Sequence, residues 1–195
     1  EATGLYVAAT DDDAFVAADW IDVAASALAA SGVDFVGGPV RPAWSAAPPA
    51  WLRPENAAFQ KVIAIQDHGD EPRRYGEGIS WPLGVNVAYR RDVFDRVGLF
   101  DPSLGRKAGT LRNQAQREWH LRAKAAGATG LYVPQMVVHH LVTVDRLSPQ
   151  YFRRWYYWHG RSRALLTARL GTSLEEPELG QAPTGPAAAW RALRR

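Results

Sequence analysis

The chain has 195 residues, of which 47% are hydrophobic and 22% are charged, and its formal net charge is +3. This length and composition suit a folded protein with its own core, organised as one domain. The absence of cysteine excludes disulfides and thiolate metal sites, the small positive charge is a weak argument for nucleic-acid binding, and no apolar run approaches the ~20 residues that span a bilayer.

The first expected element is a short strand, Leu5–Thr10, followed at once by Asp11, Asp12 and Asp13. Its apolar residues predict a strand buried on both faces, with the acids in the turn beyond its carboxyl end, where open α/β sheets bind ligands. A divalent cation such as Mg²⁺ or Mn²⁺ would relieve the repulsion among three carboxylates. The alternative is a solvated acidic turn that caps the next helix. A parallel sheet seldom begins with a single strand, so we expect upstream strands and helices to be absent from this chain.

Residues 14–32 have apolar side chains at helical spacing and predict a helix that ends at Gly32. Asp34–Val36 then predicts a strand. The strand ends in Gly37–Gly38, where the chain needs either positive φ or a close approach of two backbones. Strand, acidic loop, helix and strand together form one α/β unit.

Two loops are expected next. Residues 41–58 are rich in Pro, Ala and Trp and predict a long ordered loop. Its Trp44 and Trp51 are either platforms for an acceptor molecule or lids packed on the core. Residues 67–78 are polar and turn-rich, and we expect them to be exposed and mobile.

The alternation of Val85–Tyr89 predicts a further strand. Asn86 is a polar residue within this apolar element. Because buried amides need partners, Asn86 either ties a neighbouring loop or faces a ligand. A short helix over residues 92–97 and a basic loop over 103–113 follow.

Residues 114–126 predict a helix that ends at a glycine. Within it, Glu118 and Arg122 are spaced to form an i, i+4 ion pair. Short strands are expected at 131–133 and 136–140, and the second ends in a pair of histidines.

The last helix opens at Ser148 as N-cap, with Pro149 in its first turn. Residues 149–168 interleave arginines with aromatic side chains. This pattern fits peripheral contact with a membrane surface, a helix packed under the domain with its arginines extended to solvent, or single-stranded nucleic acid, and the last of these is not the partner we expect. Residues 169–195 predict a loosely ordered tail, after a first domain over 1–168.

Several segments, in this order and spacing, resemble the family 2 glycosyltransferases of the GT-A fold. The resemblance covers about residues 4–168, and it is carried by Tyr6–Asp13 with Asp19–Trp20, Gly37–Val40, Pro82–Arg91, Val97–Asp101, His140 with Arg146, and Tyr151–Ser162. It implies an α/β, three-layer nucleotide-diphospho-sugar transferase fold that lacks its first βα units and ends in a helix. It also implies transfer of a sugar, with inversion, from a nucleotide-sugar donor to a saccharide or lipid-linked acceptor in cell-surface polysaccharide synthesis.

The resemblance also implies roles for individual residues. Asp11 and Asp13 would form a D-x-D motif that holds Mg²⁺ or Mn²⁺ against the donor diphosphate, and Asp12 would assist. His140 would reach the metal or the pyrophosphate; the alternative is a hydrogen-bonded histidine at a strand end. Arg146 would contact phosphate or clamp the entry to the last helix. Gly84 and Asn86 would line the pocket for the donor sugar and the acceptor.

The sequence departs from this family in two places. The nucleotide-base half, usually about two βα units, is missing upstream. The acidic pair that normally begins the 114–126 helix, and whose aspartate is the general base, is replaced by Ala115 and Gln116, which cannot accept a proton. Glu118 is the nearby residue that could substitute for it.

Three hypotheses follow from these residues. The first is a metal-dependent inverting glycosyltransferase, which we expect to be cytoplasmic and peripheral on the inner face of the plasma membrane. The second is a catalytically impaired relative that binds a sugar or nucleotide. The third is a basic, aromatic module associated with membranes.

Overall fold

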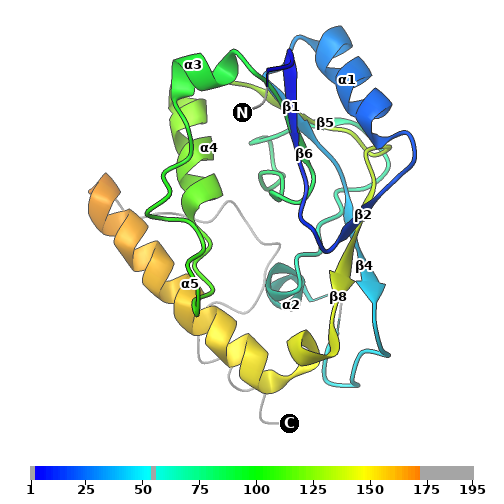
Figure 1. Cartoon of the computed structure of the whole chain (residues 1–195), viewed down its shortest axis with the longest axis vertical. Coiled ribbons are helices and arrows are strands. Elements are labelled where there is room, and N and C mark those ends of the chain that lie inside the picture. Colours follow the sequence, from blue (N-terminus) through cyan, green and yellow to red (C-terminus); the bar gives the residue numbers. More distant parts are fainter. Residues whose placement is uncertain (1–2, 54–55, 172–195) are drawn as a thin grey trace.

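The structure is a computed structural model, and it describes residues 3–53 and 56–171. These residues form two mixed sheets with helices around them (Figure 1). The first sheet has the strand order β1-β6-β3-β7-β5, with β1 (Tyr6–Ala9), β6 (Val87–Arg90), β3 (Phe35–Gly37), β7 (Gly130–Tyr132) and β5 (Arg73–Arg74). The second has the order β2-β8-β4, with β2 (Ala14–Val16), β8 (Val138–Val142) and β4 (Val40–Trp44).

Each sheet contains one parallel pair, β3 with β7 in the first and β4 with β8 in the second, while the other pairings are antiparallel. The helices are α1 (Trp20–Ser31), α2 (Ala57–Val62), α3 (Val93–Val97), α4 (Ala115–Ala125) and α5 (Pro149–Leu170), with a 3₁₀ turn at Val144–Leu147. Within the described residues, no helix is both long and apolar enough to cross a membrane.

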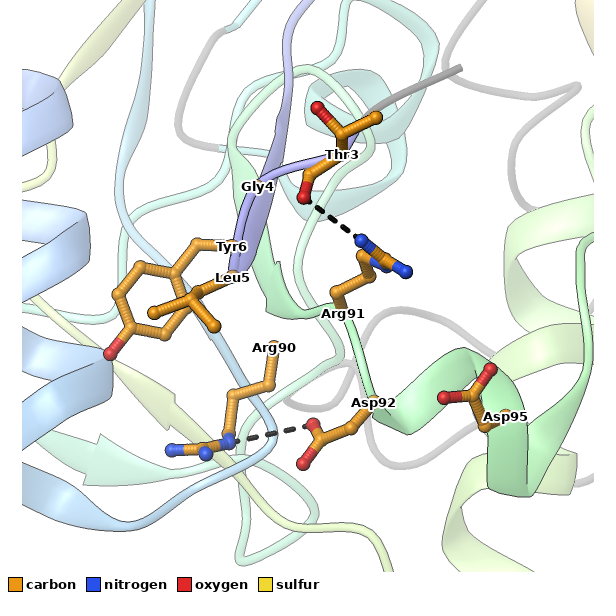
Figure 2. Close-up of a pocket in the computed structure, with 8 residues that line it drawn as sticks. All are labelled: Thr3, Gly4, Leu5, Tyr6, Arg90, Arg91, Asp92 and Asp95. Atoms are coloured by element: carbon orange, nitrogen blue, oxygen red, sulfur yellow. Dashed lines mark hydrogen bonds and ion pairs between the residues drawn. The ribbon is translucent and has the colours of Figure 1, made fainter.

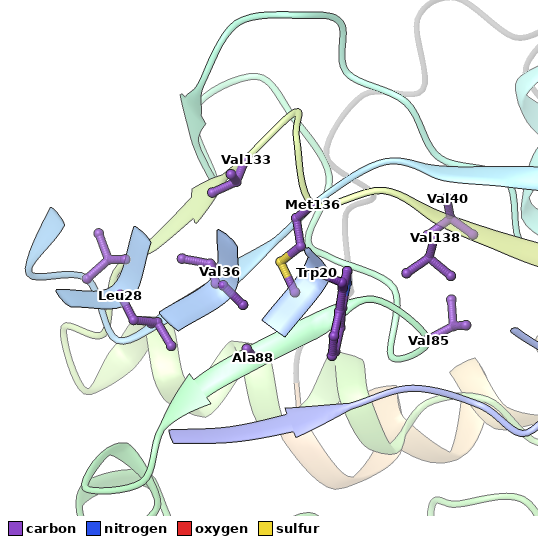
Figure 3. Packing of buried hydrophobic residues seen from close by; sticks show 11 residues of the cluster. Trp20, Leu28, Val36, Val40, Val85, Ala88, Val133, Met136 and Val138 are labelled. Carbon is purple, nitrogen blue, oxygen red and sulfur yellow. The ribbon is translucent and has the colours of Figure 1, made fainter. Parts of the chain in front are cut away.

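The first sheet lies between two layers of helix because side chains alternate between the faces of its strands. Val36 and Ala88 pack against Trp20 and Leu28 of α1 in the cluster drawn in Figure 3. The neighbours of these strand residues point to the opposite face, where α3 and α4 cover them with a second, aromatic cluster. The predicted α/β fold with three layers is therefore what this part of the chain forms.

The predicted first strand differs from the structure in its surroundings. β1 is partly exposed, and in the described chain it pairs only with β6, at the edge of the sheet and antiparallel. The expectation of a strand buried on both faces was wrong. The apolar residues of β1 are equally compatible with an edge strand that has only one face covered by the rest of the protein.

The prediction of a helix over residues 14–32 was wrong at its N-terminal end. Residues 14–16 form β2, which pairs antiparallel with β8, and α1 begins only at Trp20. A tertiary pairing with a distant strand thus overrides the helical spacing. As a result, the acids lie in a strand-to-strand turn and cap no helix.

The two predicted loops also contain regular structure. β4 and α2 occupy the two ends of the 41–58 region, with the predicted loop between them, and Pro42 is tolerated because β4 is an edge strand. Residues 67–78 include β5 and the buried Tyr75, although most of this segment is exposed, as predicted.

α5 starts as predicted, with the Ser148 hydroxyl accepting a hydrogen bond from the Tyr151 amide at 3.2 Å. Phe152 and Trp155 are buried against α2 and β8 residues in a third cluster. The aromatic residues of this helix therefore act largely as core, which fits the interpretation of a helix packed under the domain. The predicted tail lies outside the described residues from position 172 onward.

Candidate functional site

The acidic turn is held by the pairing of strands on both sides of it. β1 is fixed to β6, and β2 is fixed to β8 with Ala14 opposite His140. The Leu141 amide also donates a hydrogen bond to the Asp13 carbonyl oxygen at 2.8 Å. This register places His140 directly beside the predicted acids, although His140 and the acids lie far apart in the sequence.

Asp13 is the centre of the resulting cluster. One of its carboxylate oxygens lies 3.3 Å from His140 Nε2, and the other accepts a hydrogen bond from Arg146 Nη2 at 2.8 Å. Arg146 Nη1 lies 3.2 Å from the same histidine nitrogen. Asp11, Asp13 and His140 each present one ligand atom within 4.8 Å of the others. The carboxylates thus converge on His140 and are not splayed apart.

These three side chains suit a hard divalent cation. Burial lowers the pKa of His140, against the opposing effect of Asp13, and so favours the neutral imidazole, which is the form that binds metal ions. Two carboxylate oxygens and one neutral nitrogen match the preferences of Mg²⁺ and Mn²⁺. Asp12 lies beside this group and is exposed.

The acidic turn opens into a cleft of about 850 Å³. Its walls come from the turn, from α2 and the segment after it, from the loop before β6, from the start of α4 and from one face of α5. Of the predicted site residues, those that line the cleft are Asp11, Asp12, Asp13, Gly84, Ala115, Gln116, His140 and Arg146. The cleft therefore joins the acid cluster to the slots where the family resemblance expects carboxylates.

Asn86 lies in the interior and has a different environment. It is fully buried; its Oδ1 accepts a hydrogen bond from Trp20 Nε1 at 2.8 Å, and its Nδ2 donates to the carbonyl oxygens of Pro39 (3.0 Å) and Met136 (2.6 Å). The amide thus ties α1 to two loops. The structure does not bring Asn86 to the cleft wall.

Glu118 is likewise occupied elsewhere. It accepts two hydrogen bonds from Arg122, at 2.6 Å and 2.9 Å, in the i, i+4 pair that the sequence predicts. Arg122 also donates to the carbonyl oxygens of Val97 and Leu99. This pair fastens α4 to the end of α3, and Glu118 is absent from the residues that line the cleft.

Sequence reasoning missed a polar group at the junction of α4 and α5. Asn113, Gln114 and His159 all line the cleft and lie within 3.5 Å of one another, and the His159 ring stacks on Trp155. Tyr151, Trp155 and His159 follow one another at intervals of four residues on α5. That spacing predicts that the three side chains share one face of α5, but it does not predict which residues lie opposite that face.

A smaller pocket of about 330 Å³ lies at the other end of β1 (Figure 2). Both arginines of this pocket are already paired, because Arg91 donates to the Thr3 carbonyl oxygen at 2.9 Å and Arg90 contacts Asp92 at 3.5 Å. The large cleft is therefore the candidate site.

Comparison with known proteins gives a consistent class. No family model matches the chain. The chain is 27% identical over 166 residues to a protein of Haloferax volcanii named glucosyl-dolichyl phosphate glucuronosyltransferase, a match that covers 84% of this chain and 51% of the relative. The chain is similar to a glycosyltransferase. It is also 25% identical over 175 residues to the succinoglycan biosynthesis protein ExoM of Rhizobium meliloti, covering 89% of this chain and 52% of that protein.

The chain spans about half the length of these curated relatives. Among solved structures, one of GalNAc-T7 with UDP, GalNAc and Mn²⁺ aligns with 97% of this chain and 38% of that one, with 16% identity and a TM-score of 0.48.

Proposed function

We propose that this chain supplies the cation site and the acceptor side of an inverting, metal-dependent glycosyltransferase that acts in cell-surface polysaccharide synthesis. The observation that carries the proposal is the convergence of Asp11, Asp13 and His140 at the mouth of a large cleft. The similarity to a glucuronosyltransferase and to a succinoglycan biosynthesis protein supports it. Because the matches span about half of each relative, we propose that the nucleotide base is bound outside this cleft.

In this proposal each group in the cluster has a chemical task. The carboxylates of Asp11 and Asp13 and the imidazole of His140 would hold Mg²⁺ or Mn²⁺, and such a cation would supply stabilisation of negative charge on a departing nucleoside diphosphate. Arg146, already in contact with Asp13, is placed to pair with phosphate oxygens. The donor is a nucleotide sugar, and the acceptor is a saccharide or a lipid-linked saccharide.

The first test is metal binding by the Asp13→Asn variant. Replacing one anionic ligand should weaken Mn²⁺ binding about tenfold or more, because changes even outside the ligand set cost that much. Electron paramagnetic resonance of free Mn²⁺ measures this without a known donor. Asp70→Asn, an exposed acid outside the cleft, is the matched control. Equal Mn²⁺ affinity in the parent and in both variants would contradict the proposal.

A catalytically impaired binding protein is the second candidate, favoured by Ala115 and Gln116 in the slots for the acidic pair. It predicts donor binding without turnover, and a gain of turnover when Ala115→Glu and Gln116→Asp are combined.

We also propose that the protein works in the cytoplasm at the inner face of the plasma membrane. The exposed face of α5, with Arg153, Arg154 and Arg161, would contact anionic lipid headgroups. Sedimentation with anionic vesicles, compared with neutral vesicles, tests this contact.

A further inference from the structure

One arginine lies against the ligands of the proposed cation site. Arg146 Nη2 donates a hydrogen bond to one carboxylate oxygen of Asp13 at 2.8 Å, and Arg146 Nη1 lies 3.2 Å from Nε2 of His140. The other carboxylate oxygen of Asp13 lies 3.3 Å from the same ring nitrogen. The guanidinium thus contacts two of the three side chains that are proposed to bind the cation.

The contact between Arg146 and His140 decides what these neighbours can do together. A guanidinium has donors only, so the 3.2 Å contact makes Nε2 of His140 the hydrogen-bond acceptor. Nε2 offers a single lone pair, and a metal ion bound through this nitrogen needs that same lone pair. Asp13 differs, because the two oxygens of its carboxylate can bind an arginine and a cation at once. His140 Nε2 therefore serves either Arg146 or a cation.

The charges of the cluster lead to the same conclusion. Asp11 and Asp13 supply two negative charges, which one divalent cation balances. A guanidinium that stayed in place would add a positive charge with no counterpart in the cluster. The side chains of Arg146 and Asp13 are only 19% and 26% exposed, so solvent screens the repulsion between the two cations only in part. A bound divalent ion would thus destabilise the contact of Arg146 with Asp13.

We propose that Arg146 is an internal competitor of the divalent cation, because its guanidinium holds Asp13 and His140 until the cation displaces it into the cleft. This inference rests on the proposed function and concerns the same cation site. It predicts the opposite of a supporting role. A side chain that merely oriented Asp13 would strengthen cation binding, and its loss would weaken that binding about 10-fold to 100-fold.

The turn that carries Arg146 is fixed through its backbone. The Arg146 amide donates to the Thr143 carbonyl oxygen at 3.0 Å, and the Ser148 hydroxyl donates to the Asp145 carbonyl oxygen at 3.1 Å. Because Arg146 lines the large cleft, rotation about its side-chain bonds is enough to move the guanidinium away from Asp13. The displaced group is then available to phosphate oxygens, so the cation and a diphosphate each favour binding of the other.

The first test measures Mn²⁺ binding by Arg146→Met without any donor. Methionine keeps an unbranched side chain and removes the guanidinium. We expect this variant to bind Mn²⁺ about fivefold or more tightly than the parent, the factor that corresponds to one ion pair near the surface. Electron paramagnetic resonance of free Mn²⁺ gives both affinities. Arg74→Met, at an exposed position outside the cleft, removes the same charge from the protein and should bind Mn²⁺ as the parent does.

The second test uses the parent protein, so it does not depend on the folding of a variant. A guanidinium held by two partners rotates slowly about its Cζ–Nη bonds, and its Nη protons then give separate signals in ¹H–¹⁵N spectra. Mg²⁺, at a concentration that displaces bound Mn²⁺, should merge the separate signals of Arg146. Arg122 is the internal reference, because Glu118 and two carbonyl oxygens hold its guanidinium outside the cation cluster. The signals of Arg122 should not change.

The outcomes separate the two proposals. If Asp13→Asn weakens Mn²⁺ binding while Arg146→Met weakens it or leaves it equal, the competitor role is overturned and the cation site stands. Separate Arg146 signals that persist at that Mg²⁺ concentration overturn the competitor role as well. If neither the parent nor Arg146→Met binds Mn²⁺, the proposed cation site is wrong and this inference falls with it.

Discussion

At the scale of single residues, Arg122 shows how one guanidinium can connect several segments. It binds both oxygens of Glu118 on its own helix and reaches two carbonyl oxygens at the end of α3. Arginine suits this role because its donors form a rigid planar fork. The Glu118 carboxylate is therefore committed to a structural pair.

The variant Glu118→Gln tests this assignment. Because the pair is partly exposed and screened by solvent, we expect the free energy of unfolding to fall by only about 0.5–1 kcal/mol. Sugar transfer should stay within a few-fold of the parent, whereas loss of a general base would cost about 100-fold or more. Urea denaturation and initial-rate assays give the two values. Glu77→Gln, at an exposed site, is the control, and a large loss of transfer in Glu118→Gln alone would restore Glu118 as the base.

At the scale of elements, the passage from β3 to β4 depends on the absence of a side chain. A Cβ atom at Gly38 would lie 2.1 Å from the Met136 carbonyl oxygen and 2.7 Å from that of Val133. Both neighbours are backbone atoms and cannot rotate away. Close backbone approach, one of the two alternatives raised by the sequence, therefore explains this glycine.

Gly38→Ala should lower the free energy of unfolding by about 3 kcal/mol, the upper range for overpacking a close-packed site. Gly160→Ala is the matched control, because a Cβ on that exposed turn of α5 would meet no described atom within 4 Å outside the backbone of its own helix and its chain neighbours. This second change should raise the free energy of unfolding by about 0.5–1 kcal/mol, since alanine favours a helix over glycine. Equal effects of the two changes in urea denaturation would contradict the packing argument.

At the scale of the whole molecule, the aromatic cluster between the first sheet and α4 makes stability depend on pH. His120 is enclosed there by Trp81, Phe35 and Trp119, with ring centroids 5.1–5.4 Å away. Burial lowers the pKa of His120 to about 3, against about 6.5 in an unfolded chain. The unfolded state therefore binds the proton first as pH falls.

It follows that the stability due to neutral His120 is fully present above about pH 6.5 and declines as pH falls from there toward about 3. The parent should lose about 1.4 kcal/mol per pH unit in this window relative to His120→Phe, which keeps a ring but cannot be protonated. Urea denaturation at several pH values measures the difference. His139→Phe, at an exposed position, should leave the slope unchanged, and parallel curves for the parent and His120→Phe would refute the argument.

Local patterns predicted a large part of this molecule. The start of α5 and the Glu118–Arg122 pair depend on spacing along a single segment, whereas the three-layer α/β arrangement was implied by the family resemblance. β2 could not be predicted, because Ala14–Val16 acquires its conformation from β8, which lies far away in the sequence. Asn86 was recognised as a residue that needs partners, but choosing between a loop and a ligand required knowing that Trp20, Pro39 and Met136 surround it.

The candidate site was predictable to a similar degree. Adjacent acids and a distant histidine were identified from residue type and resemblance, and the strands bring them together. The group around His159 escaped prediction because it depends on how α5 crosses the start of α4. No periodicity within either helix encodes that crossing.

The pairing of Ala14 with His140 has a consequence for the order of assembly. Asp11 and Asp13 lie in the turn between β1 and β2, whereas His140 lies on β8, far along the chain, so neither part alone offers the complete set of ligands. In the proposed site, a cation would therefore have all three ligands only once β8 is paired with β2. A cation bound there would join two segments that are distant in the sequence and would thereby stabilise the pairing of β2 with β8. A shorter piece that ends before β8 would lack His140 and could not form the proposed site.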